Sequence, residues 1–189
     1  MTSEGIAVRT DELEQLDLLE EVVLLDESGA AVGVADKATV HDTQTRLHLA
    51  FSCHVFAPDG ALLVTRRALG KRTWPGVWTN SFCGHPAPGE RIEDAVVRRA
   101  ERELGARLET LEVALPDFRY RAVDASGIVE NEICPVYTAT VSSRDALNPR
   151  ADEVMDVEWV DPEATLAAVR ATPWAFSPWL VLQLPRLLG

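Results

Sequence analysis

The chain has 189 residues, of which 47% are hydrophobic, and its 30 acidic against 18 basic residues give a formal net charge of −12. This length and composition favour one folded domain with a sizeable core and exclude a largely disordered chain. So acidic a chain has no general attraction for nucleic acid or for anionic membranes, and we expect neither as a partner. An anionic ligand would need a local cluster of basic residues.

The chain begins with a polar, acidic segment, residues 1–19, which we expect to be a weakly ordered end or a short helix. This segment lacks the basic start and apolar run of a secretory signal, and no later stretch has the length of a transmembrane helix. The three cysteines, an odd number, do not suggest a disulfide framework. We therefore expect a single domain over residues 1–189, located in the reducing cytoplasm.

The pattern of apolar and turn residues after this segment predicts an α+β fold. Strands are expected at 21–26, 30–35, 47–57, 61–67, 77–82, 111–121, 129–141 and 156–160, and helices at 90–104, 162–170 and 178–187. Pro58, Asp59 and Gly60 predict the turn of an antiparallel hairpin. Several hairpins together with three helices favour a mixed sheet flanked by helices.

Residues 68–89 form a connection rich in Gly, Pro and aromatic residues. Such long connections are uncommon in compact domains and are often functional. Most cysteines are small buried apolar side chains, and we assign that role to Cys53 and Cys134. Cys83 differs because it lies in this polar connection. Near a bound cation and basic groups we expect it as a thiolate, acting as a base or a nucleophile.

Glu130 and Glu132 lie two residues apart in a predicted strand, so both side chains point to one face. On a solvated face they would be an ordinary acidic pair, whereas on a buried face a metal is the usual compensation for two like charges. The flanking apolar residues favour burial. Two carboxylates and three imidazoles would form a five- or six-coordinate site that suits Mn²⁺, Mg²⁺ or a crowded Zn²⁺. The candidate imidazoles are His41, His48 and His85, whereas His54 is interpreted as a core residue.

Basic residues gather around the connection despite the acidic composition of the whole chain. Lys37, Arg67 and Lys71 could clamp a diphosphate between them. Taken singly, each is equally well explained as solvated surface charge. Several cations around one connection in an acidic protein favour a shared anionic ligand.

The connection leads into the predicted helix through a recognisable spacing. The spacing is Gly84-x5-Glu90-x7-Arg98, followed by Glu103 and Gly105. It resembles the Nudix box, a loop and helix that hold a divalent metal against a diphosphate. Arg99 and Arg102 stand where Nudix hydrolases have further glutamates, which leaves Glu103 alone and disfavours a diphosphate hydrolase.

With these departures and four further motifs, the chain resembles the type I isopentenyl diphosphate isomerases over roughly residues 20–182. The further motifs are RLHLAFS at 46–52, TNSFCGHP at 79–86, ENE at 130–132 and WAFSPW at 174–179. The resemblance implies a Nudix-like fold and the isomerisation of isopentenyl to dimethylallyl diphosphate through a tertiary carbocation, in isoprenoid precursor biosynthesis.

The resemblance also implies roles for particular residues. The first metal, Mn²⁺ or Zn²⁺, would be held by His41, His48, His85, Glu130 and Glu132. A Mg²⁺ that bridges the diphosphate would be held by Glu103 and the Cys83 carbonyl. The diphosphate would be bound by Lys37, Arg67, Lys71 and Arg99. The family's catalytic groups would correspond to Glu132 as the acid, Cys83 as the base on the opposite face, Tyr120 as an assistant, and Trp179 or alternatively Trp174 facing the carbocation.

Two other functions remain as alternatives to the isomerase at this point. One is a Nudix hydrolase of nucleoside diphosphate derivatives, and the other is a non-catalytic module that binds a metal or a partner on the same scaffold. The leucine-rich end, 180–188, is expected in the core rather than in a dimer face. A monomer and a homodimer are both compatible with the sequence.

Overall fold

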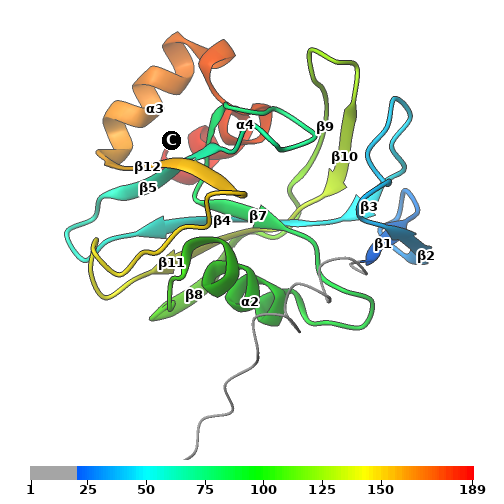
Figure 1. Cartoon of the computed structure of the whole chain (residues 1–189), viewed down its shortest axis with the longest axis horizontal. Coiled ribbons are helices and arrows are strands. Elements are labelled where there is room, and N and C mark those ends of the chain that lie inside the picture. Colours follow the sequence, from blue (N-terminus) through cyan, green and yellow to red (C-terminus); the bar gives the residue numbers. More distant parts are fainter. Residues whose placement is uncertain (1–20) are drawn as a thin grey trace, which may run out of the picture.

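The computed structural model describes residues 21–189, so the expectation for the segment 1–19 lies outside the described residues. The described part contains two sheets and three α-helices, as the predicted α+β class requires (Figure 1). The five-stranded sheet has the order β2-β1-β3-β10-β9. Its strands are β1 (Glu21–Leu25), β2 (Ala31–Asp36), β3 (His48–Leu49), β9 (Arg119–Val123) and β10 (Val129–Ile133).

The seven-stranded sheet has the order β12-β5-β4-β11-β8, with β6 paired to β5 and β7 paired to β4. Its strands are β4 (Phe51–Phe56), β5 (Leu62–Arg67), β6 (Trp78–Thr79), β7 (Phe82–Gly84), β8 (Thr110–Leu115), β11 (Val136–Thr140) and β12 (Val154–Val160). The helices are α2 (Ile92–Leu104), α3 (Pro162–Ala171) and α4 (Pro178–Leu188), with a 3₁₀ turn η1 (Pro173–Ala175).

Three long predicted strands are each divided in two by the structure. The predicted strand 47–57 divides at Ala50 into β3 and β4, and 129–141 divides at Cys134 and Pro135 into β10 and β11. In both cases the first half joins the five-stranded sheet and the second half joins the seven-stranded sheet. The prediction of continuous strands was wrong because a buried apolar run does not reveal where a chain passes between sheets. Similarly, 111–121 turns after Leu115, and β9 extends beyond it to Val123.

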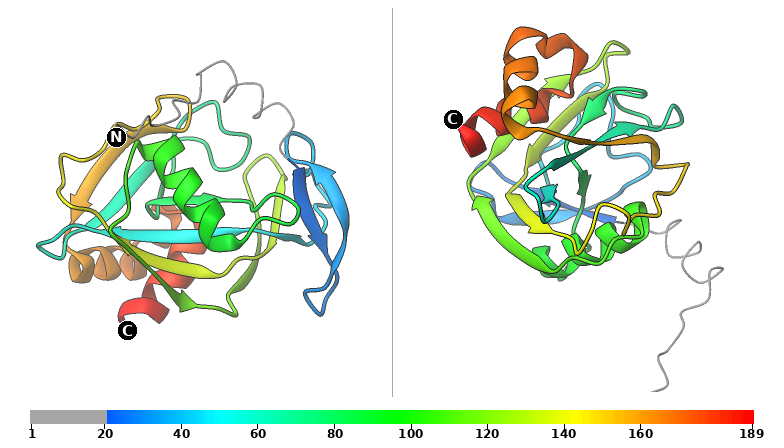
Figure 2. Two further views of the ribbon diagram at one scale, coloured as in Figure 1. Left: turned by 90° about the horizontal axis from the view of Figure 1, so that it is seen from below. Right: turned by 90° about the vertical axis from the view of Figure 1, so that its left-hand side faces the viewer.

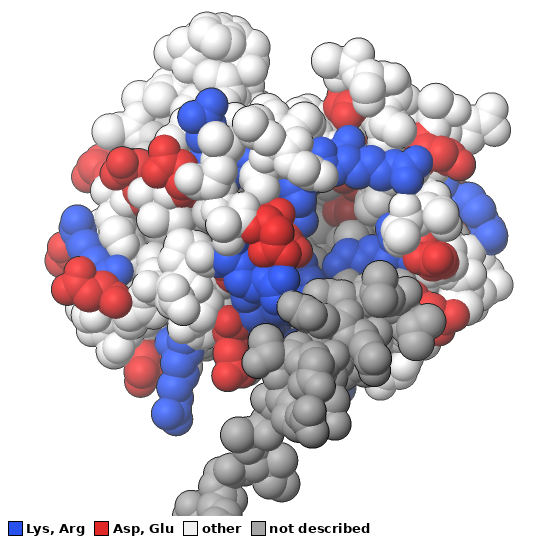
Figure 3. All heavy atoms as spheres, viewed as in Figure 1, with Lys and Arg blue, Asp and Glu red and all other residues white. Residues whose placement is uncertain are grey.

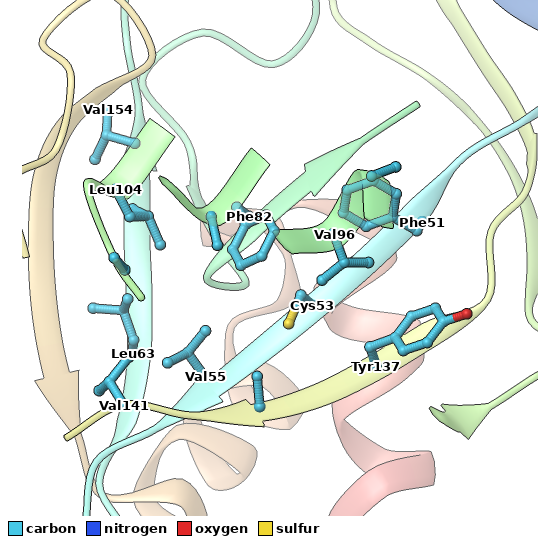
Figure 4. Packing of buried hydrophobic residues seen from close by; sticks show 14 residues of the cluster. Phe51, Cys53, Val55, Leu63, Phe82, Val96, Leu104, Tyr137, Val141 and Val154 are labelled. Carbon is cyan, nitrogen blue, oxygen red and sulfur yellow. The ribbon is translucent and has the colours of Figure 1, made fainter. Parts of the chain in front are cut away.

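The helices cover opposite faces of the seven-stranded sheet (Figure 1 and Figure 2). Successive side chains of a strand alternate between its faces. Accordingly Leu63 packs with the buried side of α2, whereas Leu62 and Val64 pack with α3 and α4. Figure 4 shows the first of these clusters, in which Val96 and Leu104 of α2 meet the sheet. The core is therefore split into two apolar layers by one sheet.

Local signals fix the ends of these helices. Asp161 accepts a hydrogen bond from the Ala164 amide at the start of α3, and Ser177 accepts one from the Leu180 amide at the start of α4. Both helices begin with proline, which is pre-organised for the first turn. Helix α2 ends at Gly105, as predicted, in the left-handed conformation at a φ of 59°. A Cβ there would lie 2.8 Å from the Asn148 Cβ.

Among residues 21–189, no helix has both the length and the apolar character needed to span a membrane. Helix α4 is buried at Leu180 and Leu184 but exposed at Leu182, so the leucine-rich segment is largely core, as expected.

Candidate active site

Histidines and carboxylates from separate elements meet where the two sheets join. One possible ligand atom from each of four residues lies within 4.8 Å of the others, and these residues are His41, His48, His85 and Glu132. The convergence follows from strand pairing, because His48 of β3 lies opposite Glu132 of β10 in parallel register. Glu130 adjoins the group through Oε2, which lies 2.8 Å from Nε2 of His41. The structure thus brings together the five residues expected at the first metal site.

Burial decides between the two interpretations of the acidic pair. Glu130 and Glu132 are each 5% exposed, so the pair does not face solvent. Glu132 Oε1 lies 3.4 Å from Nε2 of His48 and 3.3 Å from Nε2 of His85. Burial opposes its ionisation, but the two neighbouring histidines lower the pKa of Glu132 well below its usual value.

The donor atoms of this cluster fit a divalent ion. Nε2 of His41, Nε2 of His48 and Oε2 of Glu130 are buried and, despite their short distances to one another or to Glu132, form no aligned hydrogen bond among the described residues. Nδ1 of His48 donates to the Arg46 carbonyl at 2.9 Å, which leaves Nε2 with a lone pair. Burial lowers the pKa of His85 to about 3, so this imidazole is neutral, the form that binds metals. Mixed imidazole and carboxylate donors suit a divalent metal ion.

Cys83 lies on β7 beside this cluster, and its thiol is held by two oxygen atoms. Sγ lies 3.3 Å from the Ser52 hydroxyl and 3.3 Å from Oδ1 of Asn80. Desolvation raises the pKa of the Cys83 thiol to about 12, and the nearby Glu132 carboxylate adds to the rise. The thiol is therefore protonated at neutral pH in this arrangement, and the thiolate expected beside a bound cation stays a prediction. Packing and the neighbouring carboxylate outweigh the stabilising hydrogen bonds.

An aromatic group adjoins the thiol. Tyr120 lies opposite Glu132 in the β9–β10 pairing, and its ring centroid is 5.8 Å from that of Trp179. Trp179 is 2% exposed, whereas Trp174 is 83% exposed. The two tryptophans proposed by the sequence are thus separated, and only Trp179 lies with Tyr120. Trp74 packs edge-on against Trp179, with ring centroids 5.4 Å apart.

A pocket beside Cys83 contains two of the four expected basic residues, Arg67 and Lys71. Its lining residues are Thr65, Arg67, Lys71, Thr79, Phe82, Cys83, Glu103, Glu153 and Val154. Arg99 forms an ion pair with Glu103 and reaches Glu153 at 3.6 Å. Lys37 lies close enough to affect the pKa values of His85 and Glu153. On the face drawn in Figure 3, basic side chains gather near the centre, although acidic residues predominate in the chain.

Glu153 was missed by sequence reasoning. It forms an ion pair with Lys71, and its backbone carbonyl accepts from the Ala68 amide at 3.0 Å. It precedes β12 in a loop that carries no motif, so no sequence signal pointed to it. The β12–β5 pairing alone places it in the pocket.

The Nudix-like spacing has a physical basis in the loop after β7. Arg98 donates to both carboxylate oxygens of Glu90, at 2.8 and 2.7 Å, and to the His85 carbonyl at 3.4 Å. Gly84 permits close packing, because a Cβ there would lie 2.8 Å from the Phe51 ring and 2.9 Å from Arg99. The glycine, the glutamate and the arginine therefore hold the turn that presents Cys83 and His85.

Comparison with known proteins agrees with this arrangement. The NUDIX domain model matches residues 46–180. The isopentenyl-diphosphate Delta-isomerase of Leifsonia xyli subsp. xyli is 68% identical over 170 residues, covering 89% of this chain and 91% of that protein. The protein of the same name from Citrobacter koseri is 57% identical over 164 residues, covering 87% and 90%.

Solved structures share the fold at low sequence identity. A crystal structure from Deinococcus radiodurans matches with a TM-score of 0.70 and 20% identity, covering 90% of this chain and all of that one. A MutT protein from Methanosarcina mazei matches with a TM-score of 0.58 and 17% identity, covering 75% and 92%. These likenesses concern the fold alone. Because the domain model and the high-identity relatives span most of its length, the chain belongs to the Nudix superfamily and, within it, to the isopentenyl-diphosphate Delta-isomerase family.

Proposed function

We propose that the protein isomerises isopentenyl diphosphate to dimethylallyl diphosphate. The names of its relatives support this, but the observation that carries it is the position of Cys83. The residue lines the basic pocket with Arg67 and Lys71, and its thiol also adjoins the cluster that contains Glu132. A thiol and a carboxylate able to exchange protons thus lie beside a site for a diphosphate.

The reaction requires one proton to be added and another to be removed two carbons away. An isolated alkene is a weak base, so its protonation needs a well-placed acid and yields a tertiary carbocation. A second group then removes a proton from the neighbouring carbon. Two groups can perform both steps if one of them carries a proton and the other can accept one. Cys83 and Glu132 come from different sheets, which allows them to approach a substrate from different sides.

The roles of the two groups are proposed as the resemblance implied them. Glu132 donates the proton to the alkene, and Cys83 removes the second proton from the other side. A thiol whose pKa is raised to about 12 is a weaker acid than a carboxyl group, so it suits the second step, in which its thiolate is a strong base. Tyr120 lies beside Glu132 and is proposed to assist it.

The aromatic group is proposed to stabilise the carbocation. Tryptophan and tyrosine rings attract cations through their quadrupoles and offer no nucleophile that would trap them. Trp179 and Tyr120 are 2% and 7% exposed, so the reacting carbons would be shielded from water. We accordingly propose Trp179, rather than the exposed Trp174, as the residue that faces the cation.

The basic residues are proposed to bind the diphosphate, remote from the reacting carbons. Arg67, Lys71, Arg99 and Lys37 supply charge-assisted donors. Bound Mn²⁺ or Zn²⁺ in the histidine–glutamate cluster would fix the Glu132 carboxylate, and Mg²⁺ at Glu103 and the Cys83 carbonyl would neutralise diphosphate charge. Such remote binding energy serves to orient the substrate.

Diphosphate hydrolysis is not proposed. Arg99 is 3% exposed and forms an ion pair with Glu103, so a cation fills the position where a hydrolase would need another carboxylate. The cytoplasmic location and the choice between monomer and homodimer stay predictions from the sequence.

The proposal is tested by proton NMR of isopentenyl diphosphate incubated with the protein, Mg²⁺ and Mn²⁺. We expect the terminal methylene signal to be replaced by two methyl signals. Cys83→Ala and Glu132→Gln should each lower kcat at least ~100-fold, in the range of general acid–base effects. Cys134→Ala, which removes a neighbouring buried thiol, should retain most of the activity. Release of phosphate without the isomer, or full activity of Cys83→Ala, would contradict the proposal.

A further inference from the structure

The side chain of Asn80 lies between the thiol and the indole of the site. Asn80 is fully buried in the short connection between β6 and β7. Its Nδ2 donates to the carbonyls of Cys53 at 3.0 Å and Phe82 at 2.7 Å. Because both partners can only accept, the orientation of the amide is fixed by its surroundings. Oδ1 is therefore directed to the opposite side.

That single oxygen accepts hydrogen bonds from both the indole and the thiol. Trp179 donates its indole N–H to Oδ1 at 2.8 Å, and the Cys83 thiol donates to it at 3.3 Å. The Thr79 hydroxyl is a third donor, at 2.9 Å. An indole N–H is only a donor, and a buried one without an acceptor is costly. Asn80 thus joins the thiol to the indole through one atom.

The helix that carries Trp179 reaches the same thiol by a second path. Gln183 lies one turn further along α4 and donates to the Ser52 hydroxyl at 2.9 Å. Ser52 lies 3.3 Å from the Cys83 sulfur. Residues four apart lie on one face of a helix, so a single face of α4 addresses Cys83 through Asn80 and through Ser52. All of these polar side chains except Cys83 are nearly or fully buried.

We propose that Asn80 is a positioning residue, which holds the Cys83 thiol and the Trp179 indole at a fixed mutual distance. The inference rests on the proposed function, in which the thiol exchanges a proton with the substrate and the indole faces the carbocation. Asn80 does not line the basic pocket. Its loss should therefore affect the chemical step rather than the binding of the diphosphate.

The test uses two variants of Asn80 and one matched control in the full-length, metal-loaded protein. Asn80→Ala removes both functions of the amide. Asn80→Asp keeps the accepting oxygens but loses the Nδ2 donor, and it places a carboxyl group in the interior. The control is Ser81→Ala, since Ser81 is adjacent and equally buried, and within residues 21–189 its hydroxyl bonds only the Val55 amide and the Leu63 carbonyl.

We expect Asn80→Ala to lower kcat at least about 10-fold while KM changes less than about 3-fold, because small misplacements cost rate rather than binding. Asn80→Asp should be no more stable than Asn80→Ala yet should retain more kcat. Ser81→Ala should lower the melting temperature without this loss. If kcat follows the melting temperature across all three variants, or if KM alone rises, the positioning role is wrong.

A spectroscopic measurement tests the inference without an activity assay. The protein is labelled with 5-fluorotryptophan, and the ¹⁹F signal of Trp179 is assigned from Trp179→Phe. Loss of the indole acceptor should shift this signal in Asn80→Ala and leave it unchanged in Ser81→Ala. An unchanged signal in Asn80→Ala overturns the inference. Absence of isomerase activity in the wild-type protein would instead overturn the proposed function, and the ¹⁹F result would still stand.

Discussion

The hydroxyl of Thr73 donates a 2.7 Å hydrogen bond to Oε1 of Glu130. Thr73 is 4% exposed and also accepts from Arg67, through its carbonyl at 2.9 Å and its hydroxyl at 3.1 Å. One threonine therefore connects a cation of the diphosphate pocket with a carboxylate of the histidine–glutamate cluster. The proposed metal and substrate sites share a structural element.

The first prediction concerns this threonine. Thr73→Val keeps the shape of the side chain but removes the donor to Glu130, so the affinity of the cluster for Mn²⁺ should fall about 10–100-fold, as is common for groups that orient metal ligands. Thr73→Ser should restore most of it. Titration calorimetry on the chelator-treated protein measures the change. Equal affinities in the valine and serine variants would show that the hydroxyl does not orient Glu130.

The second prediction compares two buried histidines. Adding Mn²⁺ or Zn²⁺ to the chelator-treated protein should raise its melting temperature, because an ion that binds only the folded state stabilises it. His48→Ala should abolish this increase. His54→Asn should preserve it, because His54 is buried elsewhere and bonds Gln183 Oε1 at 3.0 Å. A metal-dependent increase that survives in His48→Ala would contradict the proposed ligand set.

The third prediction concerns pH and His54. Burial lowers the pKa of His54 to about 4, so it is neutral in the folded protein at neutral pH. The unfolded chain, with a pKa of about 6.5, binds this proton more readily. Stability from His54 is therefore complete above pH 6.5 and is lost as pH falls toward 4, by about 3 kcal/mol.

Urea unfolding between pH 7 and 4 measures this loss. The free energy of unfolding of His54→Asn should fall less steeply than that of the wild-type protein, since the other titrating groups are common to both. Parallel curves would indicate that His54 has no depressed pKa.

The fourth prediction separates binding from chemistry. Lys71→Met should raise KM about 10–100-fold, because one charge-assisted hydrogen bond contributes about 1.5–3 kcal/mol. The value of kcat should change only a few-fold, since the diphosphate is remote from the reacting carbons. Arg107→Met removes an exposed cation just beyond α2 and should leave both constants unchanged. A fall in kcat at constant KM would assign Lys71 to the chemical step instead.

Part of the site could be predicted from the sequence because short-range periodicity determines it. The alternation of a strand placed Glu130 and Glu132 on one face, and the structure confirms that this face is buried. His54 is a core residue, as interpreted from its apolar strand. The Gly84 turn and the helix that follows were likewise visible from their spacing.

The remainder depended on tertiary packing. The protonation of Cys83 is set by desolvation and by Glu132, which is 49 residues away in sequence (132 − 83). Glu153 enters the pocket only through the pairing of β12 with β5. The division of 47–57 at Ala50 depends on two sheets that no local pattern distinguishes. Motif spacing encodes neither the desolvation of Cys83 nor the point at which a chain passes from one sheet to the other.

The most direct test of the proton exchange is incubation of isopentenyl diphosphate with the metal-loaded protein in D₂O, followed by NMR and mass spectrometry. We predict dimethylallyl diphosphate that carries solvent deuterium in a methyl group, with the diphosphate intact, and no incorporation with Cys83→Ala. Double-bond migration without deuterium, or cleavage of the diphosphate without migration, would contradict a mechanism in which Cys83 and Glu132 exchange protons with the substrate.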